Sequence, residues 1–184
     1  MAQDHEIMLS VKNGDIQKLG QLFDKYSGQL YNYFRLQTGD SESSEDLVQN
    51  VFYSILKYSG TFKDGADFRP WMYAIARNEK INYLKSRRFL KREADTGQSG
   101  DFTRTPEADL VYKTQVHHLM EALEKISPDN RELIILNRFT GLPYAQIAEI
   151  LGCRIGALKV RMYRAIKELK DQFHKMTGDE KDEL

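Results

Sequence analysis

Apolar residues recur at helical spacing along the first third of the chain. One stripe follows Asp15 and is interrupted by Gly39-Asp40-Ser41. A second helix is predicted to start near Ser43, because Ser43 and Asp46 have the spacing of a capping box, with Asp in place of the usual Glu. Apolar positions three and four residues apart line one face of each helix. They are Ile16, Leu19, Leu22, Phe23, Tyr26, Leu30, Tyr33 and Phe34 in the first helix and Leu47, Val48, Val51, Phe52, Ile55 and Leu56 in the second.

A loop rich in glycine and polar residues follows at 59–67, and a third helix is predicted over 68–88. Ile81 and Leu84 lie outside the main apolar face of this helix, so two of its sides are predicted to be covered. The main face carries Phe68, Met72, Ile75 and Ala76.

The second half of the chain begins with a polar segment, residues 93–107, that has no hydrophobic period and is typical of a flexible linker. No segment of the chain alternates in the manner of a strand. Helical spacing resumes after the linker and predicts helices over 110–126, 129–139, 144–151 and 155–173. The sequence therefore predicts an all-α fold, with two small helical domains at 1–92 and 110–175, a flexible linker at 93–109 and an acidic tail at 176–184.

The segment 144–164 has the pattern of a helix-turn-helix. Gly152 lies at the corner between two helices, where glycine can take the positive φ that a sharp turn needs. The inner faces carry Ile147, Ala148 and Leu151 in the first helix and Leu158, Met162, Ala165 and Leu169 in the second. The outer face of the second helix carries Arg154, Lys159, Arg161, Arg164 and Lys167. Such a basic helix fits the major groove of DNA; the alternative is a plain helical hairpin with a solvated basic face.

Aromatic and basic residues alternate along 58–92. Aromatic faces can stack on unpaired bases, and cations can follow the phosphates, so the segment suits single-stranded or partly melted DNA. The alternative is that half of the aromatic rings are core, which we favour for Phe68 and Trp71. Asn78, one helical turn from Ala74 and Asn82, could read a base edge or cap a neighbouring loop.

The distribution of charge supports two contacts with a polyanion. The 184 residues include 27 basic and 27 acidic side chains, yet residues 61–92 have a net charge of +6 and residues 136–175 a net charge of +5. Acidic segments separate these two basic blocks and leave other surfaces for protein partners.

Composition excludes several kinds of site and indicates a compartment. A single cysteine, Cys153, excludes an internal disulfide and a cysteine-built zinc site, and we expect it to pack as a small apolar residue rather than act as a redox switch. His117 and His118 are expected on a solvated helical face, and neither a metal nor another cofactor is predicted. No stretch approaches the ~20 apolar residues of a membrane span, and the first residues lack the pattern of a signal peptide. The expected compartment is the cytoplasm.

Three motifs in order make the chain resemble a known family. EDLVQNVF at 45–52 is similar to conserved region 2.2 of sigma factors, FRPWMYAIARN at 68–78 to regions 2.3 and 2.4, and LEKISP at 123–128 with the helix-turn-helix to region 4. The chain therefore resembles a sigma factor of the extracytoplasmic-function (ECF) group of the sigma-70 superfamily, from about residue 15 to 173. The resemblance implies a transcription initiation factor without catalytic activity or a small-molecule substrate.

The resemblance also assigns roles to residues. The clamp helices of the β′ subunit of core RNA polymerase would be bound by four residues of the second helix, Asp46, Gln49, Asn50 and Tyr53. Opening of the −10 element, with capture of a flipped-out base, would involve Phe62, Lys63, Trp71, Arg77, Asn78, Lys85, Arg87 and Arg88. The −35 element would be read by Arg154, Ala157, Lys159, Val160, Arg161 and Arg164. Region 4 would also meet the β-subunit flap, and an anti-sigma protein, often membrane-anchored in relatives, would hold the chain inactive.

Some positions depart from the family pattern. Arg154 and Ala157 stand where Ser and Thr are usual, and Val160 replaces a common Ser, so the −35 sequence cannot be copied from relatives. Asn50 replaces a common acidic residue, and Pro143 is expected as the first residue of its helix. Two other classes of function compete with the sigma factor: a free-standing helix-turn-helix regulator whose N-terminal half senses a ligand or dimerises, and a nucleic-acid enzyme.

Overall fold

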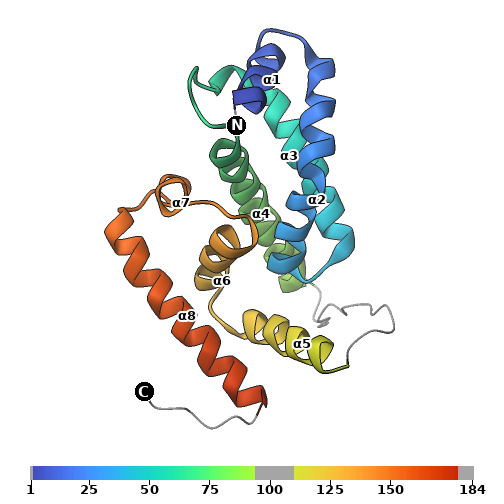
Figure 1. Cartoon of the computed structure of the whole chain (residues 1–184). Coiled ribbons are helices and arrows are strands. Elements are labelled where there is room, and N and C mark those ends of the chain that lie inside the picture. The colour runs from blue at the N-terminus through green and yellow to red at the C-terminus, as the bar shows by residue number, and fades with distance from the viewer. Residues whose placement is uncertain (1, 94–109, 178–184) are drawn as a thin grey trace. The chain divides into compact units, whose positions relative to one another are not determined.

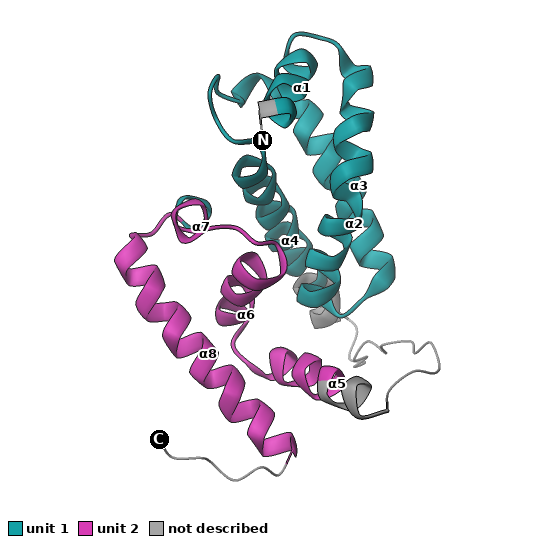
Figure 2. Cartoon of the chain, viewed as in Figure 1, with its two compact units in different colours: residues 1–101, 149–151 teal, residues 102–148, 152–184 magenta. Residues whose placement is uncertain are grey.

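The computed structural model describes residues 2–93 and 110–177, and this part of the chain contains helices and loops without a strand (Figure 1). The predicted all-α fold is thus confirmed. The chain divides into two compact units, residues 1–101 with 149–151 and residues 102–148 with 152–184 (Figure 2). The predicted linker lies outside the described residues apart from Glu93, as does the tail from residue 178, so the predicted domain boundaries remain predictions.

The N-terminal unit is built on three long helices, α2 (Leu19–Thr38), α3 (Ser41–Lys57) and α4 (Phe68–Glu93). Helix α3 packs against both α2 and α4. Most of the predicted apolar stripes are buried, as their spacing requires. In α2 and α3 the buried apolar residues are Leu19, Leu22, Tyr26, Leu30, Tyr33, Phe34, Leu47, Val48, Val51, Phe52 and Ile55.

Two residues of the first predicted stripe are not core residues. Ile16 is 59% exposed because it lies in the short 3-10 turn η1 (Ile16–Lys18) that precedes α2. Phe23 is 41% exposed, and its ring rests on Phe52 with a centroid distance of 4.9 Å. On α4 the main apolar face is buried as predicted, whereas Ile81 is half-buried and Leu84 exposed, so the second side of the helix is only partly covered.

The predicted start of the second helix is wrong by two residues. Helix α2 ends at Thr38 and is capped by Gly39, which has a φ of 73°, and α3 already begins at Ser41 after the extended residue Asp40. Ser43 lies inside the helix, where its hydroxyl donates to the Asp40 carboxylate. This hydrogen bond lowers the pKa of Asp40. A carboxylate at this end is also favoured by the helix dipole.

A helix that the sequence pattern did not predict, α1 (Ala2–Lys12), precedes η1. It contacts α2, buries Met8 and Val11, and forms an ion pair with α2 through Asp4 and Lys25. The Asp4 carboxylate, with a side chain 5% exposed, accepts hydrogen bonds from Lys25 Nζ at 2.5 Å and from the Tyr26 hydroxyl at 2.7 Å. Burial, the largest single influence, raises the pKa of Asp4, but the two hydrogen bonds and the positive charge of Lys25 lower it, and the net shift is downward.

The C-terminal unit contains α5 (Leu110–Lys125), α6 (Pro128–Ile134), α8 (Ile155–Thr177) and α7 (Tyr144–Leu151) except for residues 149–151. Helix α8 packs on α5 and α6. Helix α6 continues into a π-helical turn, η3 (Ile135–Phe139). The carboxylate of Glu168 on α8 accepts from the Ser127 backbone N–H at 3.0 Å and from the Asn130 side chain at 2.5 Å. These bonds join α8 to the first turn of α6 and fix the direction of α8.

Candidate functional site

The corner of the helix-turn-helix has the predicted geometry. Gly152 follows α7 with a φ of 63°, the left-handed conformation that favours glycine. The next N–H, of Cys153, donates to the Ala148 carbonyl at 2.9 Å and closes the end of α7. The inner faces are buried at Ile147 and Ala148 on α7 and at Leu158, Met162 and Ala165 on α8.

Two expectations for this segment are wrong. Cys153 is exposed instead of packed, because the turn carries its side chain away from the inner faces of both helices. Pro143 is not the first helical residue: α7 begins at Tyr144, and the Pro143 carbonyl accepts the first helical hydrogen bond, from the Ile147 N–H at 3.1 Å. Pro143 therefore occupies the N-cap position, where its lack of an N–H costs nothing.

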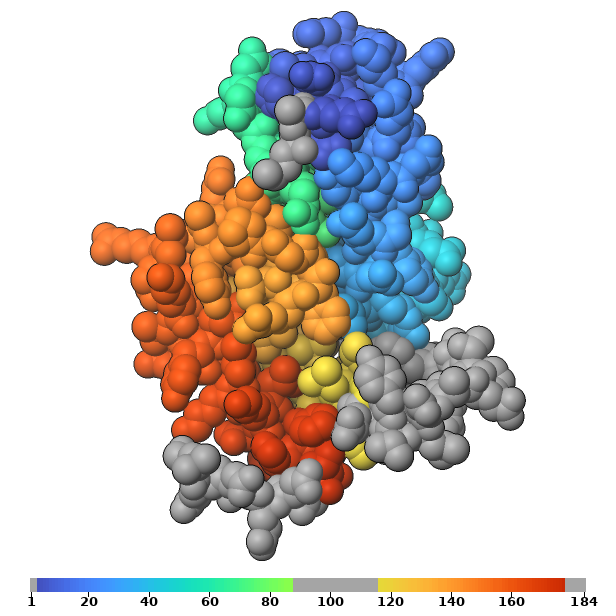
Figure 3. All heavy atoms as spheres, in the orientation of Figure 1, coloured from blue at the N-terminus to red at the C-terminus, as the bar shows by residue number. Residues whose placement is uncertain are grey.

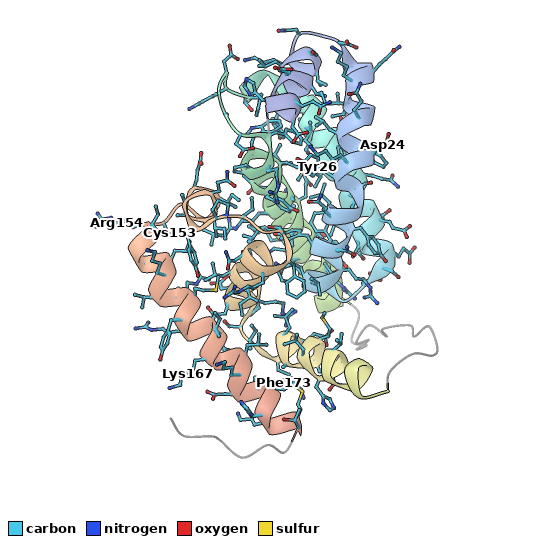
Figure 4. The ribbon with its side chains drawn as sticks, in the orientation of Figure 1. Asp24, Tyr26, Cys153, Arg154, Lys167 and Phe173 are labelled. Atoms are coloured by element: carbon cyan, nitrogen blue, oxygen red, sulfur yellow. The ribbon has the colours of Figure 1, made fainter. Side chains whose placement is uncertain are left out.

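The outer face of α8 presents the predicted basic residues. Side chains along this helix stand out from the surface of the unit (Figure 3), and Lys167 on α8 and Arg154 in the turn just before it project outward (Figure 4). Arg161 differs from its neighbours because its guanidinium lies 3.5 Å from the carboxylate of Asp129 on α6, with its side chain 38% exposed. The exposed members of the predicted −35 set are Arg154, Ala157, Lys159, Val160 and Arg164.

One residue of this face was missed. Tyr163 is 73% exposed and lies three residues after Val160 and four before Lys167, so all three share the outer side of α8. Its phenol can stack on or donate to a nucleic acid, and the same helical spacing that identified the basic residues could have identified it.

The structure separates the −10 set into surface and core. Lys63 in the loop and Asn78 and Lys85 on α4 are exposed, while Arg77 is half-buried. Arg87 donates to the Tyr83 hydroxyl at 3.1 Å and lies over the Tyr83 ring. The side chain of Arg88 lies outside the described part of the chain.

Phe62 does not present a ring to solvent. Its side chain is 1% exposed, and its ring centroid lies 5.1 Å from that of Trp71 and 6.4 Å from that of Phe68. Trp71 is half-buried and Phe68 is buried, in agreement with the preference for core at these two positions. The expectation that Phe62 contacts DNA directly therefore does not fit its burial, and Phe62 instead anchors the loop to α4.

The polar face of α3 is exposed to solvent. Asp46, Gln49, Asn50 and Tyr53 are all exposed, with Tyr53 at 68%, on the side opposite the buried apolar stripe. An exposed tyrosine among small polar groups with little net charge is typical of a protein-binding surface, because tyrosine contributes large contact area at low entropic cost.

The C-terminal unit also has an apolar groove of about 530 Å³ between α5, α6 with η3, and α8. Two cations, Arg138 and Lys170, lie at this groove. Its apolar lining consists of Val116, Leu119, Ile134, Ile166, Leu169 and Phe173.

Across the described ranges, 2–93 and 110–177, no group of three or more His, Cys, Asp and Glu residues is placed to hold a metal ion. His117 lies on an exposed part of α5, with its Nε2 3.4 Å from the Glu121 carboxylate. None of the helices formed by these residues combines the length and the apolar character that crossing a membrane requires.

Comparisons with known proteins agree with this arrangement. The model of Sigma-70 region 2 matches residues 22–89, and the model of Sigma-70, region 4 matches residues 117–169. The chain is 32% identical to the ECF RNA polymerase sigma factor BldN of Streptomyces coelicolor over 89% of its own length, although it spans only 63% of BldN. It is 27% identical to the RNA polymerase sigma factor CarQ of Myxococcus xanthus, over 82% of this chain and 86% of CarQ.

Among solved structures, the chain is similar to the sigma factor RpoE of Bartonella quintana, crystallised with the anti-sigma factor NepR. The TM-score is 0.72 at 25% identity, over 85% of this chain and 96% of RpoE. The two regions thus occur here in the same order as in the family, on the helices that carry the candidate surfaces. The chain belongs to the sigma-70 family, as a sigma factor of the extracytoplasmic-function group.

Proposed function

We propose that the chain directs RNA polymerase to promoters with three separate surfaces: α3 for the polymerase, the loop at 59–67 with α4 for the −10 element, and α8 for the −35 element. The observation that carries the proposal is the exposure of Asn78 and Lys85, seven residues apart on α4, a helix whose other side belongs to the core. A repressor that binds only duplex DNA needs no such surface, whereas a factor that holds an unpaired strand does.

The −10 surface acts on a strand that has left its complement. Extruding a base costs a few kcal/mol, and contacts to that base must offset the cost. The Asn78 amide offers both a donor and an acceptor for a base edge. The exposed Lys63 and Lys85 attract phosphates of the strand, which makes binding fall as the salt concentration rises.

The −35 surface acts on duplex DNA. Helix α8 presents Lys159 and Arg164 to the major groove, and both can bind phosphate or guanine edges. Arg161 exchanges its ion pair with Asp129 for a contact with DNA. Because Asp129 is 81% exposed, the free carboxylate returns to water at little cost.

Two protein partners complete the proposal. The exposed face of α3 docks on the clamp helices of the polymerase β′ subunit, and the apolar groove of the C-terminal unit receives the flap of the β subunit. An anti-sigma protein, of the kind named with RpoE, covers these surfaces in the inactive state. The chain acts in the cytoplasm and supplies binding surfaces without catalysis of its own.

The test combines polymerase binding with promoter opening. The purified chain is expected to co-elute with core RNA polymerase and to support run-off transcription from a promoter library. Asn78→Ala should then lower open-complex formation by roughly 5- to 150-fold, the value of about 1 to 3 kcal/mol for one lost base contact, while polymerase binding is unchanged. Asn82→Ala, the same change one turn further along α4, serves as the matched control.

Two outcomes decide against this proposal. Equal loss of polymerase binding and opening in Asn78→Ala would make Asn78 a structural residue. A chain that ignores core polymerase yet binds duplex DNA tightly would be a free-standing regulator.

A further inference from the structure

The helix α1 lies beside the loop that follows α3 (Figure 1), and it holds this loop by four polar contacts. We infer that His5 and Lys12 of α1 are positioning residues for promoter selectivity: they keep residues 62–66 in the conformation that receives the −10 element, without touching DNA. The inference rests on the proposed function, because it assigns the loop to the −10 surface.

His5 fixes the second half of the loop. Its Nδ1 lies 2.9 Å from the Ala66 carbonyl, and its Nε2 accepts from the Gly65 backbone N–H at 3.3 Å. Both contacts are satisfied together by the neutral ring with its proton on Nδ1. One ring therefore holds two successive peptide groups of a turn in which Gly65 has a φ of 79° and the Ala66 N–H donates to the Lys63 carbonyl at 3.1 Å.

Lys12 fixes the first half. Its ammonium donates to the Phe62 carbonyl at 2.8 Å and to the Asp64 carboxylate at 3.1 Å. The lysine side chain is 28% exposed, whereas that of Asp64 is 80% exposed. The contact thus neutralises a surface carboxylate that would otherwise repel a nearby phosphate, and it fixes the backbone by a charge-assisted hydrogen bond.

The underside of the loop is fixed by an aromatic contact. The buried ring of Phe62 has its centroid 5.5 Å from that of His5 on α1 and 5.1 Å from that of Trp71 on α4. Asn78 lies two helical turns beyond Trp71 on the same helix. The loop and the proposed base-reading residue are therefore connected through rigid elements, and α1 is itself held to α2 by the buried Asp4 contacts.

The loop keeps exposed side chains that can meet DNA, among them Thr61 and Lys63. If the loop were free, binding would have to order its backbone, which costs roughly a factor of five to thirty in affinity for each residue fixed. Contacts that order the loop beforehand remove this cost and favour the base that fits the preformed surface. Loss of the contacts should therefore reduce selectivity among bases more than it reduces binding of the polymerase.

The experiment uses the full chain, alone and in holoenzyme. His5→Ala and Lys12→Met each remove two of the four contacts, and Lys12→Arg retains the charge and the donors. Lys18→Met is the matched control, because Lys18 binds Ser10 of α1 at 3.1 Å and Asp15 at 3.6 Å without reaching the loop. Each variant is assayed for amide hydrogen exchange at residues 62–66, for base preference in a library randomised at the −10 element, and for affinity to core polymerase.

Amide exchange at 62–66 should accelerate about tenfold in His5→Ala and Lys12→Met, as expected for one lost hydrogen bond. Discrimination between the preferred base and the others should fall about fivefold, with polymerase affinity and −35 dependence unchanged. Lys12→Arg should retain at least half of the discrimination, and Lys18→Met all of it. Should His5→Ala fail to fold, Lys12→Met carries the same test.

Unchanged exchange at 62–66, or faster exchange with an unaltered base preference, would overturn the inference. If the same variants lost affinity for core polymerase as much as base discrimination, α1 would be a general stabilising element and not a positioning element for the loop. The Asn78→Ala variant separates this failure from that of the proposed function. If Asn78→Ala impairs opening while the α1 variants leave base preference intact, only the role of α1 is wrong; if no variant affects the −10 element, the proposed function is wrong as well.

Discussion

The buried carboxylate of Asp4 offers a sharp test of what attaches α1. Asp4→Ala removes the acceptor of two hydrogen bonds, from Lys25 and from the Tyr26 hydroxyl. The side chain of Tyr26 points into the helical packing whereas that of Asp24 points outward (Figure 4), which makes Asp24→Ala a suitable control on the same helix.

The magnitude follows from the burial of each partner. Tyr26 is 2% exposed, so its hydroxyl loses its acceptor in a site that water does not reach, at a cost of about 1 to 3 kcal/mol. The Lys25 side chain is 49% exposed and returns to water, so it adds at most about 1 kcal/mol. Asp4→Ala should therefore lower the free energy of unfolding of the N-terminal unit by roughly 1 to 4 kcal/mol.

The single tryptophan, Trp71, lies in the same unit, so urea unfolding followed by its fluorescence reports on this unit. Tyr26→Phe removes the hydroxyl instead of its acceptor, and the double variant with Asp4→Ala should cost at least about 1 kcal/mol less than the sum of the single changes. Strict additivity, or a cost of Asp4→Ala no greater than that of Asp24→Ala, would refute the reasoning.

Acidification of the wild type should release α1 as the pH falls below about 4. The pKa of the Asp4 carboxyl is lower in the folded chain than in the unfolded chain. The stabilisation by Asp4 is therefore complete above the unfolded-state pKa and is lost as the pH falls through the folded-state pKa. Hydrogen exchange at Met8 would follow this release, and equal pH sensitivity in Asp4→Ala would contradict it. Gly152→Ala should destabilise the C-terminal unit by about 1 to 2 kcal/mol through backbone strain alone, since no atom lies within 4 Å of the added Cβ; an unchanged unfolding curve by circular dichroism would argue against strain. Arg161→Ala should weaken −35 dependence in run-off transcription, whereas Asp129→Asn should strengthen it by freeing the guanidinium, and an unchanged preference in both would remove Arg161 from the recognition set.

Helical periodicity predicted most of this fold because most of the core is apolar and regularly spaced. The stripes of α2, α3 and α8 became buried faces, and Gly152 became the corner of the helix-turn-helix. Helix α1 was not predicted because only a few of its apolar residues are buried and because an ion pair provides part of its contact with α2. Nothing in the local pattern distinguishes the buried Asp4 from a solvated one; its partners lie on another helix.

The sequence predicted which residue types form the candidate surfaces better than it predicted which of these residues are exposed. Basic and polar side chains on α3 and α8 lie at the surface because a helix with one apolar face must present the other to solvent. In the loop no such period exists, and the burial of Phe62 depends on rings from α1 and α4 that the sequence does not bring together. The exposure of Cys153 likewise follows from the direction of a turn.

The exposed position of Cys153 gives the protein a natural attachment point. It is the chain's one thiol and immediately precedes Arg154, at the end of α8 proposed to approach the −35 element. A maleimide dye or spin label would react there without engineered substitutions. The same accessibility means that a bulky adduct at this sulfur would crowd the helix proposed to face the −35 element. DNA-binding measurements therefore need protein stored under a reducing agent.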